Sequence, residues 1–212
     1  GGAPNRQGEV PDPLFSPSEE ERGIWMSYFD IGVETYLFSA AYFTVSPNGK
    51  QIAYAQSGEI FLLALEGEAQ PQRVAKIRGN AGDITWSPDG SKLAFASNRG
   101  DHAFIGVLDL KGDRITYLDP SVGNDSSPAW SPDGSQIAFI RTPNERVVHM
   151  FSPRREALPF SIRVANVETG TGIEIWKASE GVGSAFSGIS AANQLWWTAD
   201  DRLVFPWEGD GW

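Results

Sequence analysis

The residues best suited to bind a ligand are four arginines close together in the chain. They are Arg141, Arg146, Arg154 and Arg155. A guanidinium group presents a planar fork of N–H donors that matches a carboxylate, so an arginine cluster suits acidic or peptide partners. We therefore predict that these four side chains bind a peptide substrate or the acidic rim of another domain. The alternative is that they only solvate the chain or pair with local acids such as Glu145 and Glu156.

The rest of the chain offers no recognisable catalytic motif. There is no Cys, which excludes thiolate catalysis, disulfides and Cys-based zinc sites. The stretch GVGSAFSG at 181–188 lacks the glycine pair that frames a nucleophilic serine, and the chain has only two histidines, His102 and His149. No phosphate-binding loop, H-E-x-x-H or EF-hand loop occurs. We therefore predict no catalytic residue, no cofactor and no metal site in this chain.

Composition and charge exclude several partner classes. The net charge of -10 argues against nucleic acid, because phosphate-binding surfaces need basic patches. No apolar run approaches the roughly 20 residues of a membrane-spanning helix. Residues 1–18 show no signal-peptide pattern and are predicted to form a flexible arm.

A short sequence occurs three times and predicts a repeated β-hairpin. The copies are FTVSPNGKQIAYAQ (43–56), ITWSPDGSKLAFAS (84–97) and PAWSPDGSQIAFIR (128–141). Within each turn the Pro presets φ for a type I turn, the Ser can bond the backbone, and the Gly tolerates a positive φ. Each copy should therefore join two strands of an antiparallel hairpin.

Two further strands follow each repeated hairpin and complete a four-stranded unit. They are expected at 59–65 and 72–75, at 103–110 and 114–119, and at 161–167 and 172–178. Four strands in about 40 to 45 residues are typical of a propeller blade. A weaker fourth copy, QLWWTADDRLVFPW (194–207), supplies half of another unit.

The predicted fold is all-β, an incomplete β-propeller of about three and a half antiparallel blades over residues 19–212. The blades are expected at about 41–75, 83–119, 127–178 and 193–212, the last one truncated. Trp86, Trp130 and Trp197 recur just before the turn and should wedge between blades. A β-sandwich, which also uses short strands and regular turns, is the alternative architecture.

Three and a half blades leave apolar faces open, because a blade buries its faces only against its neighbours. We expect that the sequence belongs to a longer natural chain, or that copies associate through the open faces. Strand order places the repeated turns at one end of the blades. The opposite end, with the long connection at 142–160, the NRGDH loop at 98–102 and the link at 180–188, should be the interaction side.

The pattern WSPDG followed by IAF or LAF resembles the WD40-like repeats of TolB, and also the N-terminal propellers of prolyl oligopeptidase-family serine peptidases, which include dipeptidyl and acylaminoacyl peptidases. The resemblance covers about residues 41–178, and DDRLVFPWEGDGW (200–212) favours the peptidases. It implies a non-catalytic propeller that gates and scaffolds a separate α/β-hydrolase domain of the same parent chain, with the catalytic triad outside the propeller. It also favours an extracytoplasmic location.

Two other functions stay open. One is a TolB-like propeller that binds protein partners and has no hydrolase domain. The other is a propeller enzyme that binds a sugar or metabolite through polar residues in its channel.

Overall fold

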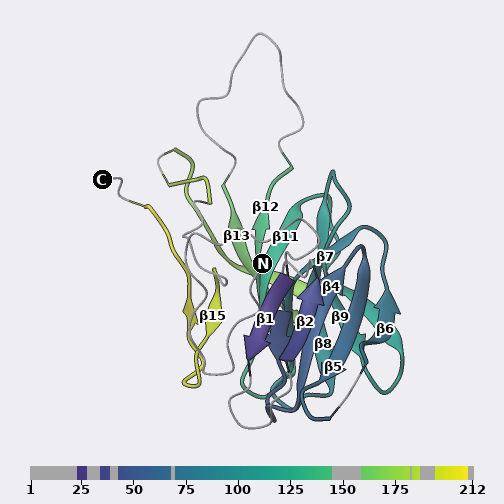
Figure 1. Cartoon of the computed structure of the whole chain (residues 1–212). Coiled ribbons are helices and arrows are strands. Elements are labelled where there is room, and N and C mark those ends of the chain that lie inside the picture. Colours follow the sequence, from purple (N-terminus) through teal and green to yellow (C-terminus); the bar gives the residue numbers. More distant parts are fainter. Residues whose placement is uncertain are drawn as a thin grey trace, which may run out of the picture.

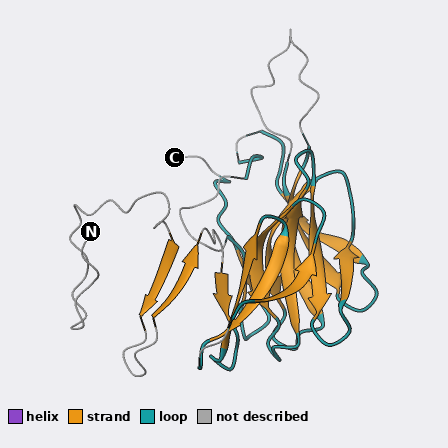
Figure 2. Cartoon of the chain, turned by 45° about the vertical axis from the view of Figure 1, so that its right-hand side comes forward, coloured by secondary structure: helices purple, strands orange, loops and turns teal. Residues whose placement is uncertain are grey.

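The computed structural model describes residues 23–27, 34–38, 43–67, 70–144, 159–181, 183–186 and 194–209. Within these ranges the chain forms strands, turns and loops but no helix (Figure 2). The prediction of an all-β, incomplete propeller of four-stranded antiparallel blades is confirmed. Residues 1–18, predicted to be a flexible arm, lie outside the described ranges.

Three four-stranded blades follow one another along the chain. Blade 1 consists of β3 (Phe43–Val45), β4 (Gln51–Gln56), β5 (Glu59–Ala64) and β6 (Gln72–Lys76). Blade 2 consists of β7 (Asn80–Trp86), β8 (Lys92–Asn98), β9 (Ala103–Asp109) and β10 (Arg114–Leu118). Blade 3 consists of β11 (Asn124–Trp130), β12 (Gln136–Thr142), β13 (Ser161–Asn166) and β14 (Gly172–Lys177). Within each blade, consecutive strands pair antiparallel.

Two hairpins lie outside these blades. β15 (Trp196–Trp197) pairs with β16 (Leu203–Val204) and forms the half blade predicted from the fourth copy of the repeat. β1 (Gly23–Ser27) pairs with β2 (Glu34–Phe38) as a separate two-stranded sheet. The blade boundaries chosen from the sequence, and their grouping into one domain over 19–212, remain a prediction.

The repeated turn closes as its sequence predicts. In the second copy, the Gly90 amide donates to the Ser87 carbonyl at 2.9 Å, and the Lys92 amide donates to Ser87 Oγ at 2.9 Å. Gly90 has a φ of 70°, a left-handed conformation that favours glycine. A Cβ on Gly90 would lie 3.7 Å from Pro47 Cδ, so the turn of blade 2 sits against the turn of blade 1.

The first strand of each blade lies innermost. β3, β7, β11 and β15 contact one another in succession, and the blades follow in chain order from blue through teal to green, with β15 in yellow (Figure 1). The repeated tryptophan reaches across each junction: Trp86 Nε1 donates to Thr44 O at 3.2 Å, and Trp130 Nε1 donates to Thr85 O at 3.3 Å. These two tryptophans are buried between blades, as predicted.

The third tryptophan of the series, Trp197, behaves differently. It is only partly buried, and its Nε1 donates to Asp201 Oδ1 at 2.7 Å within its own hairpin.

Three hydrophobic cores fill the junctions in turn: one between blades 1 and 2, one between blades 2 and 3, and one between blade 3 and the half blade. A fourth, smaller cluster of Ile52, Tyr54 and Leu63 lies within blade 1. Most of the core sits between blades, which explains why one blade alone cannot bury it.

Candidate functional site: the charged junction between blades 2 and 3

The arginines chosen from the sequence separate into two groups in the structure. Arg141 lies on β12, one residue before the end of that strand. Arg146, Arg154 and Arg155 lie outside the described residues, in the connection from β12 to β13. The structure therefore gives the surroundings of Arg141 alone, and the binding role of all four remains a prediction.

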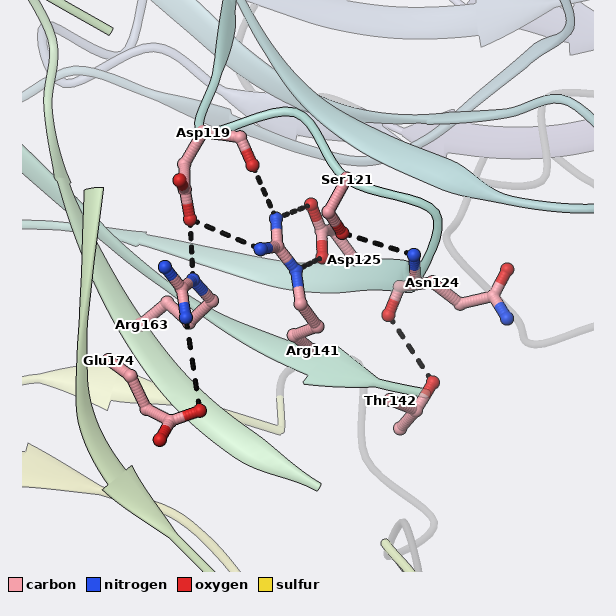
Figure 3. Close-up of polar contacts among 9 residues, drawn as sticks. Asp119, Ser121, Asn124, Asp125, Arg141, Thr142, Arg163 and Glu174 are labelled. Carbon is pink, nitrogen blue, oxygen red and sulfur yellow. Dashed lines mark hydrogen bonds and ion pairs between the residues drawn. The ribbon is translucent and has the colours of Figure 1, made fainter. Parts of the chain in front are cut away.

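Arg141 is held in a bidentate pair with a buried carboxylate. Its Nε lies 2.6 Å from Asp125 Oδ1, and its Nη2 lies 2.8 Å from Asp125 Oδ2 (Figure 3). The two residues are directly paired across β11 and β12. The Asp125 side chain is 0% exposed and the Arg141 side chain is 14% exposed. Two parallel N–H···O bonds to a buried carboxylate fix the plane of the guanidinium.

Asp119, in the link from blade 2 to blade 3, completes this junction. Arg141 Nη1 lies 3.1 Å from Asp119 Oδ2, and Arg141 Nη2 donates to Asp119 O at 2.6 Å. The same Oδ2 accepts from Arg163 Nε on β13 at 2.5 Å, and Arg163 Nη1 lies 3.8 Å from Glu174 Oε2. The amide of Asp119 donates to Gly170 O at 2.8 Å. One residue of the link is therefore tied to blade 3 through both its side chain and its backbone (Figure 3).

Burial and charge act in opposite directions on this cluster. Burial raises the pKa of Asp125, and the hydrogen bonds and charge of Arg141 oppose that rise. Burial alone would lower the pKa of Arg141, but the hydrogen bonds and charges of Asp125 and Asp119 outweigh it and raise that pKa. The arginine is therefore positively charged at neutral pH.

The junction between blades 1 and 2 contains a neutral version of the same contact. Ser97 occupies the place of Arg141 in the repeat, and its Oγ donates to Arg78 O in the preceding link at 2.9 Å. Arg141 Nη2 likewise donates to a carbonyl of the preceding link. Both junctions therefore bond a carbonyl of the preceding link from the same strand position, and Arg141 connects blade 3 to the link from blade 2.

Sequence reasoning did not identify Asp119, Asp125 or Arg163 as partners of Arg141. Its alternative to ligand binding was pairing with local acids, and both acids it named, Glu145 and Glu156, lie outside the described residues. One signal was available: the repeat has Gln56 and Ser97 where the third copy has Arg141. A charge that replaces a small polar residue at the end of an apolar strand needs a buried counter-charge.

The end of the blades opposite the repeated turns brings the links and the connections between second and third strands together. The amide of Ala103 donates to Gly123 O at 3.2 Å, and the side-chain Nδ2 of Asn144 donates to Asp101 O at 2.5 Å. We call this the loop end of the chain. It joins the NRGDH loop to the start of the long β12–β13 connection, as the strand order predicts.

The connections at the loop end differ greatly in length. Residues 57–58 join β4 to β5, and residues 99–102 join β8 to β9, whereas residues 143–160 join β12 to β13. β-bulges interrupt the middle of two inner strands: Asp83 on β7 and Ser127 on β11 have φ values of 49° and 53°, and the Ser127 amide donates to Asp83 Oδ2 at 2.9 Å.

Among the described residues, the candidate catalytic side chains do not form a recognisable catalytic arrangement. His102 Nδ1 lies 2.7 Å from Asp101 Oδ1, an adjacent residue in the β8–β9 loop, and Ser184 is buried in the link after blade 3. His149 and Ser187 lie outside the described ranges. In the part of the chain that the structure describes, no three His, Asp or Glu side chains group as a metal site requires. Those same residues contain no helix long and apolar enough to cross a membrane.

Comparisons with known proteins identify the repeat. The family model described as the TolB beta propeller domain matches residues 37–146. A comparison with curated protein sequences finds no match.

Solved structures show the same fold. TolB from Acinetobacter baumannii has 16% identity and a TM-score of 0.55, covering 87% of this chain and 43% of that one. A protein described as a TolB from Agrobacterium tumefaciens has 19% identity and a TM-score of 0.52, covering 71% and 55%. The beta-propeller domain of the Trilobed protease from Pyrococcus furiosus has 18% identity and a TM-score of 0.51, covering 69% and 47%. The chain thus spans about half the length of these structures.

Proposed function

Because the chain belongs to the TolB beta propeller domain family, we propose that it is a non-catalytic propeller segment of a prolyl oligopeptidase-family serine peptidase. In this role the blades scaffold a separate α/β-hydrolase domain of the same parent chain. They also restrict the access of peptide substrates to the active site of that domain.

One observation carries the proposal: the connection between the second and third strands is far longer in blade 3, at 143–160, than in blades 1 and 2. The turns at 46–49, 87–90 and 131–134 close by short backbone hydrogen bonds, and residues 57–58 and 99–102 close the other end of blades 1 and 2. Long connections on a rigid scaffold usually carry binding. The connection at 143–160 also contains three of the four arginines chosen from the sequence.

The structure supports a scaffold role through the way this connection is rooted. It leaves blade 3 directly after Arg141 and Thr142 and returns at Ser161, two residues before Arg163. Both arginines are bonded to Asp119, which belongs to the link from blade 2. The two roots are thereby fixed relative to the neighbouring blade.

The test is a double substitution in the parent peptidase, Arg154→Ala with Arg155→Ala. We expect kcat/KM for peptide substrates to fall at least about tenfold, which corresponds to the loss of one charge-assisted contact of about 1.4 kcal/mol. The matched control is Arg73→Ala with Arg114→Ala, two exposed arginines on the outer strands β6 and β10. Unchanged peptide kinetics together with unchanged docking of the hydrolase domain would refute the proposed role of the connection.

A second candidate function is a TolB-like propeller that binds protein partners and has no hydrolase domain. It is favoured by the family description and by the two TolB structures among the similar folds. The coding region downstream of Trp212 distinguishes the two. A G-x-S-x-G motif on a strand-to-helix turn supports the peptidase, and an open reading frame without one supports the binding propeller.

A further inference from the structure

One partly buried arginine at the loop end has no acidic partner. Among the described residues, Arg99, Arg141 and Arg163 are the arginines of intermediate burial. Arg141 and Arg163 both contact carboxylates, whereas no carboxylate of the described chain lies within ion-pair distance of Arg99. In a chain with 27 acidic residues and only 17 Lys and Arg, a half-buried arginine without an acid is an exception.

Two aromatic rings hold this arginine instead. Arg99 Cζ lies 4.6 Å from the ring centre of Phe104 on β9 and 5.0 Å from that of Tyr117 on β10. The two rings meet edge to face, with their centres 5.8 Å apart. Cation–π contacts stabilise a guanidinium and remove water from its face without consuming its N–H donors.

The three nitrogens of this guanidinium have different surroundings. Nε is buried and has no hydrogen-bond acceptor among the described residues, and it is the only such side-chain atom there. Neither terminal nitrogen is both buried and without a partner in this way. The two terminal N–H groups of a guanidinium can donate in parallel to the two oxygens of a carboxylate.

Neighbouring groups extend the site and limit the ligand class. The His102 ring packs on Phe104 with centres 4.7 Å apart, and its Nδ1 is bonded to Asp101. The apolar rings of Phe104 and Tyr117, which lie beside the arginine, suit the aliphatic stem of a glutamate side chain. The Asp101 carboxylate and the net charge of -10 disfavour a doubly charged phosphate more than a singly charged carboxylate.

We propose that Arg99, supported by Phe104 and Tyr117, is a binding site for a carboxylate carried by a polypeptide, such as a glutamate side chain. The site lies at the loop end, in the 99–102 loop whose Asp101 carbonyl accepts from Asn144 at the start of the β12–β13 connection. It requires neither Arg154 nor Arg155, and it holds whether the chain serves a peptidase or a TolB-like binding propeller.

The experiment measures binding to this chain with a capped peptide, acetyl-Ala-Glu-Ala-amide, and its glutamine counterpart. NMR shifts of the Gly100 amide and the Arg99 side chain report the site. We expect saturable binding of the glutamate peptide with a dissociation constant on the order of 1 to 10 mM, as for one charge-assisted pair. The glutamine peptide should bind at least about tenfold more weakly.

Two variants and one control test the role of the arginine. Arg99→Gln should abolish the binding, and Arg99→Lys, which keeps the charge but not the planar fork, should weaken it about fivefold or more. Arg114→Gln, an exposed arginine on β10 of the same blade, should leave it unchanged. Circular dichroism confirms that each variant is folded.

Three results would overturn the proposal. The first is the absence of saturable shifts at about 50 mM peptide, well above the expected dissociation constant. The second is equal binding by Arg99→Gln and the unaltered chain. The third is displacement of the peptide by inorganic phosphate at lower concentration than by glutarate, which would assign the site to phosphate.

Discussion

At the scale of single residues, the buried pair between Arg141 and Asp125 contributes both to the pairing of β11 with β12 and to the packing of blade 3 against the link from blade 2. The carboxylate is inaccessible to water, and both of its oxygens are bonded to the guanidinium. The same guanidinium reaches Asp119 in the link. A charge at this depth is tolerated because its partners are fixed by two strands and one link.

Removing one member of this pair should destabilise the chain strongly. Arg141→Gln leaves the Asp125 carboxylate buried without its counter-charge, and we expect the free energy of unfolding to fall by about 3 kcal/mol or more. Urea unfolding followed by tryptophan fluorescence measures the change. Arg202→Gln is the control, because Arg202 pairs with Asp200 at 3.0 Å in an exposed turn and should change stability little. Equal effects of the two substitutions would contradict the structural role of the pair.

The aspartates of the repeated turns should give the chain an acid-sensitive stability. Hydrogen bonds from Ser87 and Ser91 lower the pKa of Asp89 from 3.8 to about 2, and Ser131 and Ser135 act in the same way on Asp133. The unfolded chain therefore takes up protons at higher pH than the folded chain does. The resulting stabilisation is complete above about pH 4 and is lost as the pH falls toward 2.

A double substitution isolates this effect. Asp89→Asn with Asp133→Asn should keep the turns, because Asn48 already accepts from Ser46 Oγ and the Lys50 amide in the first copy. Thermal unfolding between pH 2 and 5 should show a shallower loss of stability than in the unaltered chain. The control is Asp113→Asn in the β9–β10 turn, because Asp113 makes none of these serine contacts. An unchanged pH profile in the double variant would mean that other carboxylates dominate.

At the scale of elements, the end of the link from blade 1 to blade 2 packs too closely to accept a side chain. Gly79 ends the link from blade 1 to blade 2 with a φ of 85°, and a Cβ there would lie 2.1 Å from Asn98 O. Gly49, in the first repeated turn, has a similar φ of 70° but no atom within 4 Å of such a Cβ. A comparison of the two glycines therefore separates the energetic cost of the left-handed conformation from the cost of close packing.

Alanine at these two positions should have different costs. Gly49→Ala should lower the free energy of unfolding by about 1 kcal/mol, since only the left-handed conformation is penalised. Gly79→Ala should lower it by about 3 kcal/mol or more, because β8 and the link must also move apart. Paired denaturation curves give the comparison. Similar losses would show that the link can relax around the added methyl group.

The strands themselves follow from local chemistry, which explains why they were predicted well. Alternating apolar residues and the Ser-Pro-Asn-Gly or Ser-Pro-Asp-Gly turn make β4, β8 and β12 end within one residue of the ends of the repeated copies. The repeated tryptophan packs between blades in all three places, because Trp197 also contacts the core between blade 3 and the half blade. Its Nε1 differs from those of Trp86 and Trp130 in that it donates to Asp201 of its own hairpin.

At the scale of the whole molecule, exposed apolar side chains gather beside the half blade. Ile173 and Ile175 on β14 are 66% and 46% exposed, and Val204 on β16 and Trp207 are 51% and 50% exposed. Their neighbours Val164, Trp176, Leu203 and Phe205 pack into the core between blade 3 and the half blade. Ile173, which pairs with Val164, and Trp207, which contacts Trp176, thus continue an apolar face that β15 and β16 cover only in part. Val204 points to the opposite side of the half blade, because Leu203 and Phe205 both pack into that core.

These exposed apolar side chains, on both sides of the half blade, should make the chain associate with itself. We expect light scattering to show a mass that rises with concentration, and Ile173→Lys with Val204→Lys to shift the chain toward the monomer. Val122→Lys is the control, because Val122 is 80% exposed but lies in the link between blades 2 and 3, away from this face. A monomer at all concentrations, or an equal shift by the control, would contradict self-association through the half blade.

The sequence by itself determined the repeated hairpin, the four-stranded unit and the position of the long β12–β13 connection. Each depends on residues adjacent in the chain: a proline that presets φ, a glycine that accepts φ > 0, and alternating side chains that select one face of a strand. Only the tertiary structure decided the partners of Arg141 and the isolation of Arg99. Asp119 precedes Arg141 by 22 residues, and Tyr117 follows Arg99 by 18, so these contacts arise only when the strands pair and the blades pack together.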